Sequence, residues 1–495
     1  MSNRERGLMV KGTTNGSRQK AVERLLTRIL QVPYRLLDLL EAVKDLRTLE
    51  ERTYRLIAEV TCDALGILLE ALDDQFRAEV QAPCEGKAVR TLVGVVGEIR
   101  FQRRFYRGLG FVLDERMGIP GRSRISPWLR EWAVEMATEA SYRTVARWLS
   151  RWTGQSISHQ TVWNEVQTWG EQRIQEQARE RERVFGEGRP APEGQPIAWL
   201  QVEGDGVAIA LQKRGRQPDD PRRGELKVAI AYEGWEDEGR PAKRRRLKHK
   251  IAVLGMEDSQ AFAERTRLAV GRHWSWEQVL VSGDGAAFVK TMAEELEASW
   301  YQLSRYHLRK AIHEAIHDAS VARTVWDLAN SGQTEKLFEV LEAYQAALRG
   351  KARNKVAKLI GYLKANEDGL ADYRQRGLKG IRADQPGIGS IESSNEQIVC
   401  NRYKKLGRAW SVAGADRLAR LIELQHNGEL AAWLRAHSPF QAIDTTAVHR
   451  ALPPVRALLP DDPEAWLRAR LPALSGPANP TRHALAGLAG LRLSA

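Results

Sequence analysis

Two aspartates in the sequence stand where a carboxylate could do chemistry. Asp205 interrupts the long apolar run at 197–212 and lies between Gly204 and Gly206, which let another group approach closely. Asp284 also stands between glycines, at the end of a later apolar run. A buried carboxylate is costly unless it is paired or binds a cation. Each GDG motif alone is typical of a turn aspartate, but two of them on strands of one sheet predict a shared site.

A third carboxylate comes from the stretch GIGSIESSNEQIVCNRYKKLGRAWS, where Glu392 and Glu396 stand one helical turn apart ahead of a basic run. Either glutamate could form a surface ion pair with that run or hold a metal ion beside a phosphate. Ser393-x-x-Glu396 fits a capping box, in which the glutamate reaches back to the helix N-terminus. This interpretation gives Glu396 a structural role, although an exchange of roles between the two glutamates stays open.

Two aspartates and one glutamate form an all-oxygen ligand set, which suits Mg²⁺ or Mn²⁺ rather than zinc. Two such ions ~3.5–4 Å apart can activate a water or a 3′-hydroxyl and stabilise the leaving oxygen of a phosphodiester. In a basic chain, this ligand set predicts a nuclease or a strand transferase.

The overall charge of the chain favours an anionic partner. Its 495 residues include 76 Lys and Arg against 63 Asp and Glu, for a net charge of +13. Nucleic acid is the first candidate, although a generally basic soluble protein would carry the same charge. The three cysteines include no CxxC pair, so they predict no disulfide framework or cysteine zinc site. Without a long apolar run or a signal-peptide core, we expect a cytoplasmic, nucleoid-associated protein with no membrane span.

Changes in periodicity divide the chain into segments. Alternation around Gly97 predicts a hairpin after N-terminal helices. After a Gly- and Pro-rich linker, three strands, a helix, a strand, a helix and a fifth strand at 301–308 predict an α/β domain with a mixed sheet. The expected segments are a basic arm at 1–20, N-terminal helices with a β-hairpin at 21–135, a helix-turn-helix and linker helix at 136–190, the first part of the α/β core at 191–308, a helical region at 309–385, the glutamate helix at 386–437 and a C-terminal tail at 438–495.

Residues 141–170 predict two short helices joined by a turn at Gly154. The first has an apolar stripe that ends at Trp152, and the second can be capped by Ser156 or Ser158. Such a pair suggests a DNA-binding helix-turn-helix, although a plain helical hairpin inside a bundle has the same pattern. The residues that would face DNA are His159, Gln160, Thr161 and Asn164.

The acidic residues lie in three blocks, EGDGVAIALQ, GDGAAFVK and SIESSNEQIVCNRYKKLGRAWSVAGA. In this order they resemble the acidic blocks of bacterial insertion-sequence transposases of the mutator-like superfamily, closest to the subgroup with a WS…GA ending. The resemblance covers about 195–425 well and the N-terminal half more loosely. The family's IESxN pattern falls on Ile391–Asn395, so the resemblance implies that Glu392 completes a DDE triad with Asp205 and Asp284.

The resemblance implies a fold as well as an activity. The expected fold class is an α/β catalytic core, ribonuclease-H-like with a helical insertion, plus a mainly α N-terminal DNA-binding region. The expected protein binds the ends of its element, cuts and rejoins DNA with two Mg²⁺ or Mn²⁺ ions, and works as a homodimer or larger assembly on DNA. Two alternatives stay open: a non-catalytic DNA-binding regulator derived from a transposase, and a metal-dependent nuclease without strand transfer.

Several further residues could contact DNA. The basic residues after the glutamates, Arg402, Lys404, Lys405 and Arg408, could bind phosphates or form a solvated helix face. Two loops, 212–225 and 243–250, could track the DNA backbone or protect exposed sheet edges. The family's Cys- or Asp-x-x-His motif falls on Ser304 and His307, where we favour a hydrogen-bonded core histidine. Trp410 could stack on a base, but we favour a place in the core.

Overall fold

The structure is a computed structural model that describes residues 3–121, 123–212, 221–236, 246–376, 381 and 387–437, with side chains from residue 16 except at 40–42 and 406. The described residues belong to one compact unit, Met1–His437. The expected tail at 438–495 lies outside them, as do 213–220 and 243–245 of the two basic loops. No helix within the described ranges is long and apolar enough to cross a bilayer.

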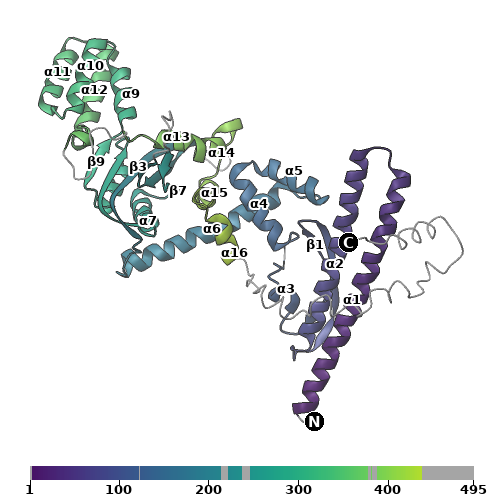
Figure 1. The fold of residues 1–495 in the computed structure, drawn as a ribbon. Helices are drawn as coiled ribbons and strands as arrows, with labels where there is room; N and C mark the ends of the chain where they lie inside the picture. The colour runs from purple at the N-terminus through teal and green to yellow at the C-terminus, as the bar shows by residue number, and fades with distance from the viewer. Residues whose placement is uncertain are drawn as a thin grey trace, which may run out of the picture. The chain divides into compact units, whose positions relative to one another are not determined.

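The N-terminal part consists of helices and one β-hairpin (Figure 1). The expected basic arm differs from the structure, because residues 3–20 belong to the first long helix. Strands β1 and β2 are antiparallel and joined by a two-residue turn, with Gly94 opposite Gly97. Gly97 has φ +141°, which explains the glycine at this end of the turn. The elements are α1 (Asn3–Ala42), α2 (Leu46–Arg77), β1 (Cys84–Gly94), β2 (Gly97–Tyr106) and α3 (Val112–Arg116).

Three helices follow, α4 (Pro127–Glu139), α5 (Tyr142–Thr153) and α6 (His159–Arg181). Each begins after a serine whose side chain accepts a hydrogen bond from the backbone of the first turn, and Ser158 caps α6. Gly154 ends α5 with φ +69°, a left-handed conformation that favours glycine. The expected pair of helices at 141–170 is therefore confirmed, and its second helix is longer than expected.

A five-stranded mixed sheet follows, in the order β7-β4-β3-β8-β9. β3 is antiparallel to β4 and parallel to β8, and β8 is parallel to β9. Two helices and a small separate hairpin connect the strands, so the expected α/β order is confirmed. The elements are β3 (Gln195–Ala210), β4 (Arg223–Tyr232), β5 (Gly234–Glu236), β6 (Arg246–Lys248), β7 (Ile251–Gly255), α7 (Ser259–Gly271), β8 (Trp274–Gly283), α8 (Ala287–Glu295) and β9 (Trp300–Leu303).

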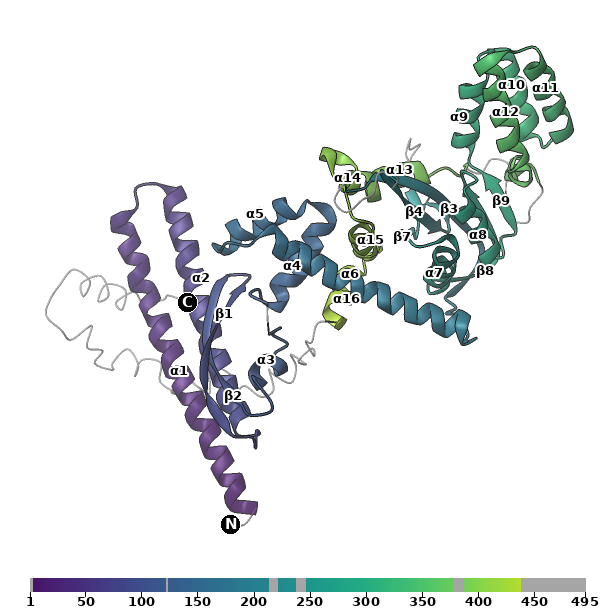
Figure 2. The ribbon, with the colours of Figure 1, turned by 180° about the vertical axis from the view of Figure 1, so that it is seen from behind.

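The two faces of the sheet are covered by different helices (Figures 1 and 2). One face packs on α7 and α8, through residues such as Val202 and Phe288. The other face, which includes Val207, shares a single core with α4, α5, α6 and the C-terminal helices. The boundary expected near residue 190 therefore does not separate two cores, because the helix-turn-helix packs into the same core as the sheet.

A helical region follows β9 directly. The fifth strand ends at Leu303, earlier than expected, and a helix begins at Arg305. The expected helical character of 309–385 is confirmed up to Lys364, and two 3₁₀ turns come after it. Figure 2 shows α10, α11 and α12 packed side by side, and they share one apolar core. The helices are α9 (Arg305–Ala315), α10 (Ala319–Asn330), α11 (Thr334–Ala346) and α12 (Gly350–Lys364).

The glutamate segment is not one regular helix. It runs as α13 (Ile391–Asn395), a π-helical turn at Glu396–Cys400 and α14 (Asn401–Tyr403). The expected continuation is interrupted around Trp410, which forms a bridge with Leu211 at the end of β3. Two helices then complete the described chain, α15 (Val412–His426) and α16 (Leu430–His437).

Candidate metal centre

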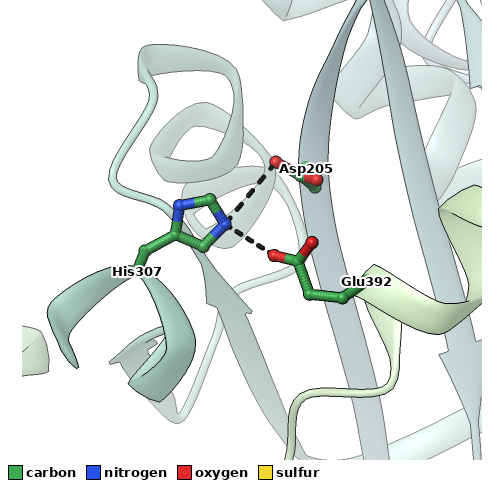
Figure 3. A group of neighbouring side chains, drawn as sticks. All are labelled: Asp205, His307 and Glu392. Carbon is green, nitrogen blue, oxygen red and sulfur yellow. Dashed lines mark hydrogen bonds and ion pairs between the residues drawn. The ribbon is translucent and has the colours of Figure 1, made fainter. Parts of the chain in front are cut away.

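Three side chains from three distant parts of the chain meet at one end of the sheet (Figure 3). Asp205 comes from β3, His307 from α9 and Glu392 from α13, and their ligand atoms all lie within 4.8 Å of one another. His307 Nε2 lies 2.7 Å from Glu392 Oε1 and 3.9 Å from Asp205 Oδ1. Two of the three predicted acidic residues are therefore brought together, with a histidine between them.

Asp284, the third predicted acidic residue, stands beside this group. Gly204 and Gly283 are partners on the parallel strands β3 and β8, so Asp205 and Asp284 follow at the same level. The Asp284 carboxylate accepts a hydrogen bond from its own loop, at Ala286 N, and is not part of the close group. The strand register places both aspartates at one edge of the sheet, and the negative charge of Asp284 contributes to the raised pKa of Asp205.

The loop after Asp284 is held from the helical region. Tyr362 of α12 donates a hydrogen bond to the backbone oxygen of Asp284, 2.8 Å away. Asn366, just beyond α12, packs so closely on Gly285 that a side chain there would collide with it. Gly285 also has φ +90°. The glycine after the aspartate is therefore required both by the backbone conformation and by the close approach of this segment.

Electrostatic conflict marks the centre. Burial and the negative charges of Glu392 and Asp284 raise the pKa of Asp205, His307 opposes them, and together these effects bring it to about 6. Crowded carboxylates of this kind are stabilised by a cation. The donor set of two carboxylates and one imidazole fits a divalent ion that accepts oxygen with some nitrogen, which includes Mn²⁺. Asp205, Glu392 and His307 could hold such an ion, with Asp284 beside them.

Asn395 is a site residue that our sequence reasoning quoted in the IESxN motif without giving it a role. Its Nδ2 donates to Asp205 Oδ2 at 2.5 Å, and the side chain is buried. Its Oδ1 has no hydrogen-bond partner among the described residues. Because Asn395 lies one turn after Glu392 on the same segment, one helical turn both supplies a ligand and orients the first aspartate.

Glu203 is a second residue that the sequence reasoning missed. It lies two positions before Asp205 on β3, so both side chains point to the face that α13 covers. Glu203 is 1% exposed and accepts hydrogen bonds from Tyr232 Oη at 2.6 Å, Ser390 N at 3.0 Å and Ile391 N at 3.2 Å. Its carboxylate therefore holds the N-terminus of the segment that carries Glu392.

The acidic residue inside an apolar strand was a usable signal for Glu203, because burial raises its pKa and demands partners. Gly204, between the two acids, points to the opposite face. A side chain there would lie 3.0 Å from Met292 and 3.2 Å from Val289 of α8. The EGDG motif is thus explained by two acids that face α13 and a glycine that lets α8 pack closely.

His307 forms a hydrogen bond, as expected, but its expected place in the core is wrong. His307 lies in the first turn of α9 rather than at a strand end, and its side chain is partly exposed among the carboxylates. Ser304, the other half of the motif, lies just before α9 and beside Gly283 of the neighbouring strand. Its buried hydroxyl has no hydrogen-bond partner among the described residues.

The capping box proposed for Glu396 is also wrong. The structure begins α13 after Ser390, and Ser393 Oγ donates to the Ser390 backbone oxygen instead of capping a helix. Glu396 is exposed and lies 3.1 Å from Lys405 Nζ. A surface ion pair, one of the two simple roles first considered for these glutamates, therefore describes Glu396.

The basic residues after the glutamates do not share one surface. Arg402 is 3% exposed, donates to the Ala137 backbone oxygen and lies over the rings of Tyr142 and Trp410, so it is not a free phosphate contact. Arg408 donates to the backbone oxygens of Asn401 and Arg402 in α14. Lys404 and Lys405 are exposed. Fewer of these residues than expected are therefore free to bind phosphates, because Arg402 is buried against aromatic rings.

Trp410 is buried, as we favoured. Its Nε1 donates to the Tyr403 backbone oxygen at 3.1 Å, and its ring packs on Tyr403 and Tyr142. In this position the ring has no open face for a base, so the stacking alternative is not supported.

The predicted DNA-facing residues lie at the start of α6. Gln160 and Asn164 are exposed and bond to each other at 2.9 Å. Thr161 is partly buried and lies 2.9 Å from the Ser158 hydroxyl. Trp152, expected in the apolar stripe of α5, is instead 48% exposed.

Comparisons with known proteins give one family. A family described as an uncharacterised protein family, UPF0236, matches residues 39–436. A UPF0236 protein in the vanSb 3′ region of Streptococcus gallolyticus is 25% identical over 425 residues, which cover 82% of this chain and 89% of that protein. A UPF0236 protein of Caldanaerobacter subterraneus subsp. tengcongensis is 24% identical over 404 residues, or 79% and 81% of the two chains. Another from the same strain is 23% identical with 79% and 80% covered, and its name joins eleven locus designations.

Proposed function

The chain belongs to the UPF0236 family, and from the geometry of its candidate metal centre we propose that it is a DNA transposase of the DDE type. It would bind the ends of its own insertion element and catalyse divalent-metal-dependent strand cleavage and strand transfer. We further propose a ribonuclease-H-like core, a working unit of two or more copies on DNA, and Mg²⁺ or Mn²⁺ as cofactor. The mixed sheet, with aspartates on two adjacent parallel strands, supports that core.

One observation carries the proposal. Asp205 and Glu392, from distant segments of the chain, meet beside His307, and Asp284 follows the end of the neighbouring strand at the level of Asp205. Carboxylates repel one another, so a chain without a use for them would not be expected to bring three together. The net charge of +13 favours an anionic partner, which is the kind of substrate that such a centre would act on.

Each residue of the candidate metal centre would have a separate role in the reaction. Bound divalent ions would polarise the phosphodiester and lower the pKa of a water or a 3′-hydroxyl. Asp205, Asp284 and Glu392 would hold the ions, and His307 would add a nitrogen donor or a hydrogen bond to Glu392. Asn395 would orient Asp205, and Glu203 would fix the backbone next to Glu392. In this arrangement a side-chain nucleophile is not required, so no covalent protein–DNA intermediate is expected.

The relatives add an independent argument. A name that joins eleven locus designations in one strain indicates a gene present in many copies. Copies that multiply within one genome are what a mobile element leaves behind. A regulator that only binds DNA would not explain them as simply.

The test uses the whole chain with labelled DNA from the borders of its gene. Cleavage at the element ends with Mg²⁺ or Mn²⁺, lost in Glu392→Gln while DNA binding remains, would support the proposal. Binding without any cleavage would favour the non-catalytic regulator. Cleavage without joined product, when target DNA is supplied, would favour a nuclease. Inverted repeats on both sides of the gene would argue for an element of its own.

A further inference from the structure

Helix α5 (Tyr142–Thr153) exposes a row of arginines. Arg143, Arg147 and Arg151 follow one another at intervals of four residues, so they lie on one face of the helix. All three are exposed. None of the three forms an ion pair with a residue in the described part of the chain.

This row is unfavourable for the helix by itself. Like charges four residues apart repel each other, and α5 contains no acidic residue to offset them. Arg143 also stands in the first turn, where the partial positive charge at the helix N-terminus disfavours a cation. A row with these properties is understandable if an anion outside the chain provides the missing partner.

The side chains beside the row are aromatic rather than polar. Trp148 and Trp152 follow Arg147 and Arg151 directly in the sequence and are 45% and 48% exposed. The ring of Trp152 packs edge-on against Trp132, with 5.2 Å between the ring centroids, so it is held in place. An ordinary solvated helix face would present polar groups here, whereas arginine next to tryptophan is typical of nucleic-acid surfaces.

We propose that the row Arg143–Arg147–Arg151 binds the phosphate backbone of duplex DNA. Successive arginines are about 6 Å apart along the helix axis, so the row spans about 12 Å. Over that length, one strand of B-DNA presents about three to four phosphates. In a helix-turn-helix the first helix crosses the DNA backbone, and α5 holds that place relative to α6. The contact would set orientation on DNA without reading sequence.

This inference rests on the proposed function for one point, that the partner is DNA. It needs neither cleavage nor a metal ion. The test therefore measures binding of the full chain to a random-sequence duplex of about three helical turns, in EDTA, over a range of salt concentrations. Changing Arg143, Arg147 and Arg151 together to Gln should lower the log–log salt slope by roughly 2–3, because each phosphate contact contributes ~0.9. The corresponding change to Lys should keep the slope, since the charge is retained.

A matched control removes three exposed cations from another helix, by changing Lys351, Lys355 and Lys358 of α12 to Gln. The control should leave the slope as in the wild type. An unchanged slope in the arginine variant would overturn the inference, and so would equal losses in both variants, which would reflect net charge alone.

Polyglutamate distinguishes an acidic protein partner from DNA. If it displaces the duplex from the wild type as well as an equal charge of DNA does, and loses that ability with the arginine variant, the row binds acidic protein surfaces and the inference fails. A wild type that does not bind the duplex would also overturn it. A chain that binds through the row but never cleaves would instead overturn the proposed function and leave this inference standing.

Discussion

Asp205 carries the main electrostatic conflict of the candidate metal centre, because burial and the charge of Glu392 both disfavour its ionised form. This conflict arises because β3, the strand that buries Asp205, also places it next to α13, which carries Glu392. A site with such a conflict is often functional, although structural networks perturb carboxylates as well. What distinguishes this one is the histidine between the two acids, at 2.7 Å from Glu392.

The pH dependence of metal binding should report the raised pKa of Asp205. Its pKa of about 6 lies above the ordinary value of 3.8, so the proton must leave before the carboxylate can bind a cation. We expect Mn²⁺ affinity to rise as the pH increases through about 6 and then to level off. Without metal, the sign for stability is opposite: the contribution of Asp205 is full below its unfolded pKa and is lost as the pH rises through about 6.

Titration of Mn²⁺ by electron paramagnetic resonance across this pH range measures the effect. Asp205→Asn is the control, because the amide has no proton to lose there. Affinity that stays flat in the wild type, or that changes equally in the variant, would assign the pH dependence to another group.

Glu203 should act through Glu392 rather than on the ion itself. Glu203→Gln keeps the shape of the side chain but weakens its bonds to Ser390 N and Ile391 N. Because groups that support a ligand typically contribute 10–100-fold to metal affinity, we expect Mn²⁺ affinity to fall by about that factor. Tyr232→Phe removes one donor to Glu203 and should give a smaller loss.

The control for Glu203 is another buried glutamate. Glu165 pairs with Arg130 at 2.6 Å, on the helices of the helix-turn-helix region. Glu165→Gln should lower the free energy of unfolding without changing Mn²⁺ affinity. If both variants lose stability and neither changes the affinity, Glu203 is only structural.

Residue types in the sequence were enough to single out the three acids as candidates but not the residues that support them. Asp205, Asp284 and Glu392 stood out because acidic residues between glycines or ahead of a basic run are unusual. Asn395 and His307 did not, since an amide on a helix and a lone histidine are common in ordinary cores. Their roles depend on which segments meet in three dimensions, and spacing along the chain does not contain that information.

At the scale of elements, periodicity predicted most of the sheet and the helical region, while errors lay at boundaries. YQLSRYHL alternates as a strand would, yet β9 stops at Leu303 and α9 begins two residues later. That shift moved His307 from an expected strand end to a helix facing the carboxylates. The glutamate helix was likewise predicted as continuous, whereas a π-helical turn at Glu396–Cys400 interrupts it. Tertiary contacts decide such boundaries.

Glu396 gives an element-level prediction that reverses its expected role. Because it does not cap the helix and pairs with Lys405 on the surface, Glu396→Gln should change the free energy of unfolding by less than about 1 kcal/mol. DNA cleavage should remain close to wild type, in contrast to Glu392→Gln. Urea unfolding and an end-cleavage assay measure the two effects. A large loss of cleavage in a folded Glu396→Gln protein would instead support the alternative in which the two glutamates exchange roles.

At the scale of the whole molecule, the helix-turn-helix and the sheet fold together. Helix α6 packs on α15, and Val166 and Trp169 share a core with Leu418. Sequence composition suggested a linker near 190, because Gly and Pro gather there, but composition says nothing about packing across it. A fragment that ends at 190 would leave those residues without their partners. DNA recognition is therefore better measured on the full chain than on such a fragment.

Glu423 of α15 connects α6, α7 and β7 through its side chain. Its buried carboxylate accepts hydrogen bonds from Arg265 of α7 at 2.6 Å, from Gln177 of α6 at 2.9 Å and from Leu254 N of β7 at 2.9 Å. The nearby positive charges, Arg265 first, outweigh burial and lower the pKa of Glu423. Arg265 also pairs with Glu257 at 2.7 Å, so removing Glu423 takes away one of its two carboxylates. The same removal leaves the buried donors of Gln177 and Leu254 without their acceptor.

Glu423→Ala should therefore lower the free energy of unfolding by roughly 3–5 kcal/mol. The loss should affect the helix-turn-helix region and the sheet together. Urea unfolding followed by tryptophan fluorescence and by circular dichroism should show one coincident transition, because the core is shared. Glu429→Ala is the surface control: Glu429 lies 3.7 Å from His273 with both side chains well exposed, so its loss should cost less than about 1 kcal/mol. Two separate transitions in the wild type, with Glu423→Ala shifting only one of them, would mean that the DNA-binding helices and the sheet unfold independently. The arginine row on α5 would then belong to a different folding unit from the metal centre, whereas a single transition would mean that the two unfold together.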